Sequence, residues 1–210
     1  MTTKRSTDTA RPGTDLRGRL IDEAINLLER EGLEALTLRG IARAAGVSHM
    51  APYRHFADKD ALLAAIAEAG FRELSASMDR SVATATTAKS PLRAIGMAYV
   101  HFARHRPALY RLMFGPVRSD RERFPELAVA SRATFAHCAA AVAERIAPSD
   151  GANEDAQEVL ALAAWSLVHG LSSLLIDGRL GKLQNAEDED RLVGQIMALF
   201  GRAFQMPDPA

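Results

Sequence analysis

Apolar residues recur at helical spacing along almost the whole of this 210-residue chain, and this pattern constrains the possible folds more than any other feature. Leu16, Leu20, Ala24 and Leu27 begin the pattern, and steps of three or four residues place them on one face of a helix. No long stretch alternates apolar and polar residues between turn residues, as a half-buried strand would. The sequence therefore predicts an all-α protein.

Glycine, proline and capping residues divide the chain into predicted helices. Ser90-Pro91, for example, combines an N-cap with a proline at the first helical position, and Gly46 ends a short helix that Thr37 caps. Residues 1–14 lack apolar periodicity, so we expect a flexible arm there. The predicted helices cover residues 16–31, 38–45, 48–56, 59–78, 91–106, 109–114, 125–146, 153–176 and 187–204.

The composition is that of an ordinary globular protein, with 48% hydrophobic and 25% charged residues. The single cysteine, Cys138, excludes an internal disulfide framework and indicates a reducing, cytoplasmic location. The N-terminus has no apolar signal-peptide core, and we expect no membrane-spanning run.

The formal net charge of zero conceals an uneven distribution. Residues 1–149 carry a net charge of +6, and residues 150–210 carry −6. Within 36–59, Arg39, Arg43, Arg54 and Lys59 face a single acidic residue, Asp58. Neutrality of the whole chain therefore does not exclude a nucleic-acid partner, because binding depends on the local charge.

The segment from Thr37 to Phe56 has the physical properties of a helix-turn-helix. Leu38 and Ile41 would bury one face of a first short helix, and the small residues at 44–46 would let a second helix approach closely. Gly46 supplies the backbone freedom that a sharp turn requires. The second helix, 48–56, would then expose polar, aromatic and basic side chains, and such a helix fits the major groove of DNA.

Two segments resemble a known family. The run 36–66, LTLRGIARAAGVSHMAPYRHFADKDALLAAI, resembles the N-terminal domain of the TetR family of transcriptional repressors, and 165–171, WSLVHGL, is similar to the Trp…His-Gly signature of one TetR C-terminal subgroup. The resemblance implies a flexible arm at 1–14, a helix-turn-helix DNA-binding domain at 15–60 and a ligand-binding and dimerisation domain at 61–206. The residues that carry the first match are Ile41-Ala42, 45–48, Tyr53, His55-Phe56, Lys59 and Leu62-Leu63.

The resemblance also implies which side chains contact a double-stranded DNA operator. Hydroxyls, amides at helix starts and cations are the groups that bind phosphates, which agrees with the residue types at these positions. Tyr53 and His55 could alternatively pack within the motif, and we expect Phe56 to be core. The candidate DNA contacts are Thr37, Arg39, Ser48, His49, Met50, Tyr53, Arg54, His55 and Lys59.

Two residues depart from the family pattern. Gly40 lies inside the first short helix, where glycine costs about 1 kcal/mol relative to alanine. Pro52 stands where the family commonly has Leu, Ile or Val, and it either tightens the first turn of the recognition helix or moves the helix start. This leaves the base contacts at 49–53 open.

For the C-terminal domain the resemblance implies a small-molecule ligand and a homodimer. The last two long helices, 153–176 and 187–204, would pair with their copies as a four-helix bundle, and Gly170, Ser172 and Ser173 are small enough for close crossing. A fully buried helix in a monomer is the alternative. The candidate pocket residues are Tyr99, Phe102, Tyr110, Met113, Phe114, Phe135, Trp165 and His169.

The sequence thus favours a ligand-responsive DNA-binding repressor, with no metal or other cofactor expected. A helical scaffold that has lost DNA binding is a second hypothesis, which only Gly40 and Pro52 support. An enzyme is the weakest hypothesis, because the chain shows no paired carboxylates, phosphate-binding glycine loop or nucleophile elbow.

Overall fold

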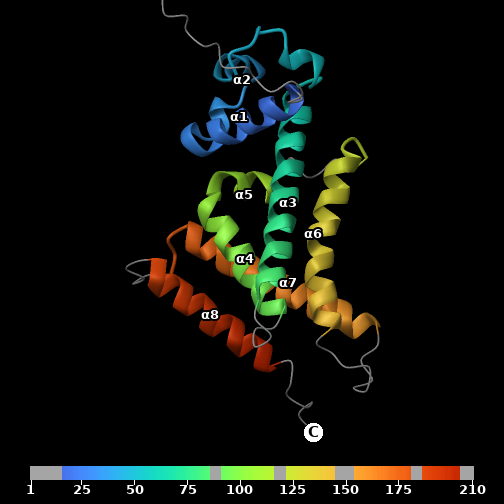
Figure 1. Cartoon of the computed structure of the whole chain (residues 1–210), viewed down its shortest axis with the longest axis vertical. Coiled ribbons are helices and arrows are strands. Elements are labelled where there is room, and N and C mark those ends of the chain that lie inside the picture. Colours follow the sequence, from blue (N-terminus) through green and yellow to red (C-terminus); the bar gives the residue numbers. More distant parts are fainter. Residues whose placement is uncertain (1–15, 86–90, 116–121, 145–153, 181–185, 204–210) are drawn as a thin grey trace, which may run out of the picture. The chain divides into compact units, whose positions relative to one another are not determined.

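The computed structural model describes residues 16–85, 91–115, 122–144, 154–180 and 186–203, and these residues form α-helices and two short 3-10 helices without any strand (Figure 1). The all-α prediction is confirmed. The arm predicted at 1–14 lies outside the described residues, as does the predicted N-cap Ser90. The chain divides between Leu62 and Leu63 into two compact units, which are described separately.

The N-terminal unit consists of short helices around a small apolar core. It contains α1 (Leu16–Glu31), η1 (Leu33–Ala35), α2 (Leu38–Ala44), η2 (Pro52–Arg54) and the beginning of α3 (Lys59–Thr84). The apolar face that the sequence predicts for α1 is buried apart from the half-buried Leu16, and α1 packs against η1 and α2. The core side chains include Leu20, Leu28, Leu36, Ile41, Phe56 and Leu62.

The turn after α2 takes the form that Gly46 allows. Gly46 has a φ of +66°, in the left-handed region, and its N–H donates to the Arg43 carbonyl at 3.2 Å. The Val47 N–H donates to the Ala42 carbonyl at 2.9 Å, so the two bonds together make a Schellman motif. The predicted stop at Gly46 is confirmed, and the chain turns sharply toward the segment that follows.

The helix predicted over 48–56 is wrong in type and length. Only Pro52–Arg54 is helical, as the 3-10 helix η2, and turns and a bend precede it. Pro52 has no N–H to donate to the Ser48 carbonyl, four residues earlier, so an α-helix through 48–52 loses a bond. The Ala51 N–H instead donates to Ser48 at 2.9 Å, and His55 donates to Pro52 at 2.9 Å, which is the three-residue spacing of a 3-10 turn.

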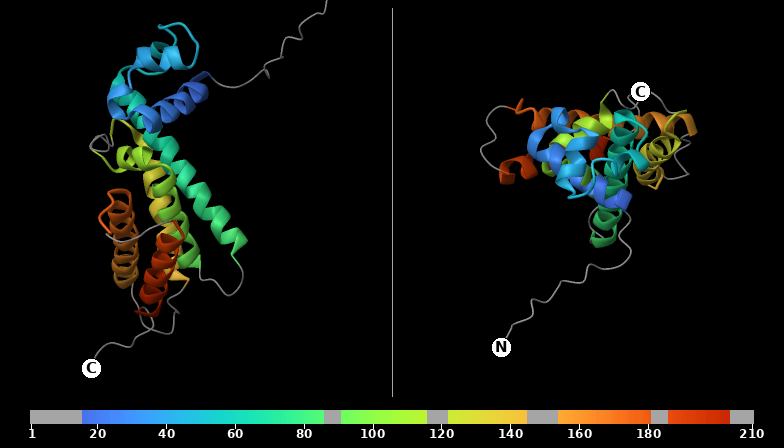
Figure 2. Two further views of the ribbon diagram at one scale, coloured as in Figure 1. Left: turned by 90° about the vertical axis from the view of Figure 1, so that its left-hand side faces the viewer. Right: turned by 90° about the horizontal axis from the view of Figure 1, so that it is seen from above.

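The C-terminal unit is a bundle arranged around α4 (Pro91–His105), which packs against the four helices that follow it (Figure 2). Arg104 on α4 makes ion pairs with Glu189 at 2.8 Å and Asp190 at 2.5 Å, and both carboxylates lie at the start of α8. Apolar packing and these bonds hold α8 beside α4. The four other helices are α5 (Pro107–Phe114), α6 (Pro125–Ala143), α7 (Glu154–Ile176) and α8 (Ala186–Ala203).

Helix α7 corrects one expectation from the sequence. Its window from Asp155 to Ile176 has a mean hydropathy of 1.9 and is 28% buried, so by length and composition it could cross a membrane. The expectation that no run reaches this length is therefore wrong. A single helix of this kind is weak support for a membrane span, because core helices of soluble proteins have the same composition.

Candidate nucleic-acid interface and ligand cavity

The candidate DNA contacts gather on the part of the N-terminal unit that follows α1. All of them are exposed except His55, which is half-buried. Two large apolar groups are among the exposed side chains, Met50 at 54% and Tyr53 at 45% exposure. The packing role considered for Tyr53 therefore does not fit its environment, whereas His55 lies beside Phe56 with ring centroids 6.4 Å apart.

The start of α2 shows how Thr37 and Gly40 work together. The Thr37 hydroxyl accepts a hydrogen bond from the Gly40 N–H at 2.9 Å, so the predicted N-cap is confirmed. A Cβ on Gly40 would lie 2.9 Å from that hydroxyl oxygen and 3.1 Å from the Ala35 carbonyl oxygen. Glycine at this position is therefore a consequence of close packing, and it leaves Arg39 exposed in the first turn of the helix.

Pro52 and Phe56 anchor the segment that carries the exposed side chains. Both are buried, and the Arg17 guanidinium lies over the Phe56 ring, 5.7 Å from its centroid. Between these two buried residues, the Tyr53 and Arg54 side chains are exposed. The 3-10 helix η2 thus exposes aromatic and basic side chains, the residue types expected of a recognition helix, although its backbone is wound more tightly than an α-helix.

The charge around this surface favours an anion. Asp58, the single acidic residue within 36–59, is the N-cap of α3, and its Oδ1 accepts from the Ala61 N–H at 2.8 Å. Lys59 follows it and is exposed. Including the flanking Glu34 and Asp60, four basic residues stand against three acidic ones over 34–60, so the local charge is slightly positive.

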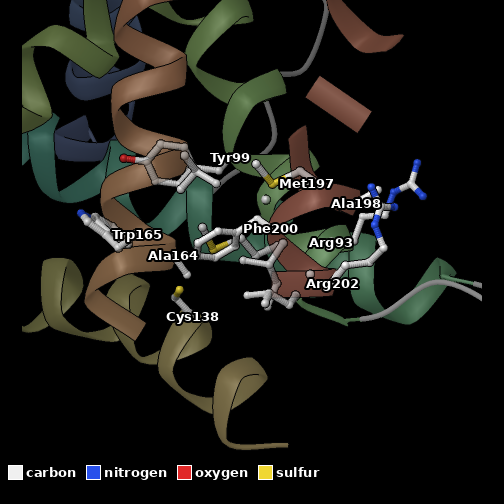
Figure 3. A pocket seen from close by; sticks show the side chains of 15 residues that line it. Arg93, Tyr99, Cys138, Ala164, Trp165, Met197, Ala198, Phe200 and Arg202 are labelled. Atoms are coloured by element: carbon white, nitrogen blue, oxygen red, sulfur yellow. The ribbon is translucent and has the colours of Figure 1, made fainter. Parts of the chain in front are cut away.

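A cavity of about 250 Å³ lies within the C-terminal unit, among helices α3, α4, α6, α7 and α8 (Figure 3). It is predominantly apolar, as small-molecule sites usually are. Among the described residues that line it, Arg93 and Arg202 are the charged ones, and none is acidic. The lining residues are Met78, Leu92, Arg93, Ile95, Gly96, Tyr99, Cys138, Ala164, Trp165, Val168, Met197, Ala198, Phe200, Gly201 and Arg202.

Of the eight pocket residues expected from the sequence, Tyr99 and Trp165 line this cavity, and the other six are not among its lining residues. Phe135 packs behind Trp165, with ring centroids 5.6 Å apart. Three of the six, Phe102, Phe135 and His169, lie on α4, α6 and α7, but on other sides of these helices than the residues that line the cavity. The other three, Tyr110, Met113 and Phe114, belong to α5, none of whose residues lines the cavity.

Several of these side chains instead form an aromatic cluster around His169. The Tyr99 and Tyr110 hydroxyls lie 2.9 and 2.8 Å from His169 Nδ1, and the Phe114 ring meets the imidazole edge-to-face at 4.6 Å. Burial raises the pKa of both tyrosines, so their hydroxyls stay protonated. This cluster fixes the Tyr99 ring, one side of which forms a wall of the cavity.

Sequence reasoning missed the polar end of the cavity. Arg93 lies in the first turn of α4 and Arg202 in the last turn of α8, far apart in sequence. Nothing in their local pattern distinguishes them from other surface arginines. Cys138 is buried and lines the cavity, and burial raises the pKa of its thiol to about 11.

A helix-turn-helix unit with an exposed basic and aromatic surface, followed by a helical bundle, defines a DNA-binding transcriptional regulator. Residues 20–66 match the family profile described as bacterial regulatory proteins, tetR family, and residues 92–200 match the tetracyclin repressor-like C-terminal domain. The chain belongs to the TetR family of transcriptional regulators. The resemblance seen in the sequence is confirmed, and the protein is a regulator rather than an enzyme.

Individual relatives agree with this family. The HTH-type transcriptional activator FasR of Mycolicibacterium smegmatis is 26% identical over 199 residues, covering 93% of this chain and 86% of FasR. The nucleoid occlusion factor SlmA of Actinobacillus pleuropneumoniae is 31% identical over 97 residues, about half of each protein. A protein of unknown function from Rhodococcus sp. RHA1 has the same fold, with a TM-score of 0.75, 33% identity and coverage of 93% and 98%.

Proposed function

We propose that this chain is a homodimeric repressor that binds a palindromic double-stranded DNA operator and leaves it when a small molecule binds the C-terminal unit. A cytoplasmic location follows from this proposal, since the operator is there. The observation that carries it is the exposed set of hydroxyl, aromatic and basic side chains on and around 48–54. Phosphate contacts would position the unit, and His49, Met50 and Tyr53 would lie nearest the base edges.

The outer face of α7 supports the dimer. Val159 and Leu162 are 65% and 56% exposed, and Leu174 continues the same face. A Cβ on Gly170 would have no atom within 4 Å, so packing within the described residues does not require glycine there. An exposed apolar stripe with a glycine suits close crossing by a second copy of the helix. Leu199 on α8, 63% exposed, would extend the interface.

One of the small residues expected at this crossing is placed otherwise. Ser172 is fully buried within the C-terminal unit, because it lies two residues beyond Gly170 on another side of the helix. Ser173 is half-buried on the same side as Gly170, and its hydroxyl donates to the His169 carbonyl at 3.0 Å. The proposed interface therefore rests on Val159, Leu162, Gly170 and Leu174.

Dimer geometry would make the DNA response possible. Two DNA-reading surfaces need to lie about one helical turn apart, roughly 34–36 Å, to read a palindrome. A ligand that binds more tightly to a dimer conformation with a different separation of these surfaces would weaken operator binding. The loss of operator-binding free energy cannot exceed the difference in the ligand's binding free energy between the two conformations.

The scaffold hypothesis loses its support in the structure. Gly40 is explained by the close approach of Thr37 and Ala35, and Pro52 is a buried anchor. Neither residue therefore indicates that the chain has lost DNA binding.

Selection from a random DNA library followed by fluorescence polarisation would test the DNA interface. We expect a palindromic consensus, and Tyr53→Ala should weaken binding to it about tenfold or more, because a base-proximal contact is lost. Lys59→Ala should weaken binding to all sequences and reduce the slope of log affinity against log salt by about 1.

Arg30→Ala is the matched control, because Arg30 is an exposed arginine on α1 next to Glu31, away from the proposed contacts. It should bind as the wild type does. Wild-type affinity in both test variants would reject the assignments, and selection without any consensus would reject operator binding.

A further inference from the structure

The cavity of the C-terminal unit has a strongly asymmetric chemistry. Figure 3 shows Arg93 and Arg202 together at one end, away from Trp165 and Cys138. Both arginines are exposed, so this end is the mouth, whereas the Cys138 end is buried. With two guanidinium groups and no carboxylate among the lining residues, the cavity opposes a cationic ligand.

The two guanidinium groups are available to a ligand. Among the residues that the structure describes, neither Arg93 nor Arg202 makes an ion pair, although Arg104, Arg106, Arg111 and Arg191 all do. Like charges brought together repel each other, and an anion between them would relieve this repulsion. A guanidinium also offers parallel N–H donors that match the two oxygens of a carboxylate.

The inner part of the cavity suits an apolar body. Trp165, Phe200 and Met197 contribute apolar surface, and the Tyr99 hydroxyl is engaged near His169 and Tyr110. The ring of Tyr99, rather than its hydroxyl group, therefore lines the cavity. Aromatic walls favour edge-to-face or offset contact with an aromatic or alkyl group.

We propose that this cavity binds a small amphipathic carboxylate, with its carboxylate between Arg93 and Arg202 and its apolar body against Tyr99 and Trp165. The volume of about 250 Å³ lies just below the range of about 300–1,000 Å³ that holds drug-sized ligands, so the ligand is small. This inference rests on the proposed ligand response and specifies the class of its ligand.

The position of the site also explains how binding could reach the dimer. Arg93 and Tyr99 belong to α4, whereas Arg202, Met197 and Phe200 belong to α8, one of the two proposed dimer helices. A ligand that bridges α4 and α8 would bind tightly in one relative position of these helices, and so would favour that position.

Trp165 provides a direct assay, because it is the single tryptophan of the chain and lines the cavity. The full-length protein, without DNA, would be titrated with 4-phenylbutyrate, 4-phenylbutan-1-ol and 4-phenylbutylammonium, with tryptophan fluorescence as the readout. These probes share one apolar body and differ in head-group charge. We expect the carboxylate to bind about tenfold or more tightly than the alcohol, and the ammonium to bind most weakly.

The double variant Arg93→Gln/Arg202→Gln should remove the preference for the carboxylate over the alcohol while the alcohol still binds. Arg191→Gln is the matched control. Arg191 is an exposed arginine on α8, the helix that also carries Arg202; it pairs with Asp188 and is not among the residues that line the cavity. It should retain the wild-type preference. Both arginines of the double variant are exposed, so the variant should fold, and unfolding in urea would check this.

Equal binding of the three probes, preference for the ammonium, no fluorescence response to any of them, or an unchanged preference in the double variant would each overturn the inference. The DNA-binding proposal would survive all of these outcomes, because it is measured separately by polarisation. Conversely, carboxylate binding that leaves the protein–DNA complex intact would support the cavity assignment and reject release by this class of ligand.

Discussion

Gly40 shows how a residue that looks unfavourable in sequence can be required by packing. Glycine within a helix costs about 1 kcal/mol relative to alanine. At this position, however, a Cβ would press against the capping hydroxyl of Thr37 and the backbone carbonyl of Ala35. The backbone carbonyl cannot rotate away as a side chain could. The local cost is therefore offset by the N-cap and by the close contact between η1 and α2.

Gly40→Ala should for this reason destabilise the N-terminal unit, by about 1–3 kcal/mol, the usual cost of overpacking. Gly18→Ala on α1 is the matched control, since a Cβ there would meet nothing within 4 Å. It should be neutral or stabilise by up to about 1 kcal/mol. Urea unfolding of both variants would measure the two changes. Equal stabilisation by both substitutions would show that the contact at residue 40 is harmless.

At the scale of elements, the segment after Gly46 depends on one proline. Pro52 is buried, so it contributes to the core, and its missing N–H disfavours an α-helix over 48–52. The result is a set of turns and the 3-10 helix η2 where an α-helix was predicted. The backbone of the proposed DNA-contacting surface therefore depends on a proline at a core position.

Pro52→Leu keeps an apolar side chain at this position and restores the N–H. We expect residues 48–55 to become more α-helical, because the new N–H can donate to the Ser48 carbonyl. The Cα chemical shifts of these residues, measured by NMR, should move toward α-helical values. Shifts that stay at their wild-type values would show that the proline does not cause the 3-10 conformation.

At the scale of the whole molecule, charge and exposed apolar surface are distributed unevenly along the chain. The C-terminal segment from residue 150 carries −6, yet α7 within it includes the exposed Val159 and Leu162. The proposed partner of that stripe is a second copy of the chain. Such an interface would remove the apolar residues of α7 from water.

Leu162→Glu should convert the dimer into a monomer, because a carboxylate would be buried at the interface without a partner. Val129→Glu is the matched control: Val129 is 57% exposed on α6, away from the α7 stripe. Sedimentation velocity at micromolar concentration would measure the mass of each species. A wild-type protein that sediments only at 22.7 kDa, or a Leu162→Glu variant that stays dimeric, would contradict the proposed interface.

The sequence by itself determined the all-α class, most helix boundaries, the Thr37 cap, the Gly46 turn and the family. These features depend on periodicity and on local hydrogen bonding, which neighbouring residues control. Only the tertiary structure decided that 48–56 is not an α-helix, that six of the eight expected pocket residues lie elsewhere, and that Arg93 joins Arg202. A helical pattern gives the side that is apolar, but rotation and packing decide which apolar side chain borders a cavity.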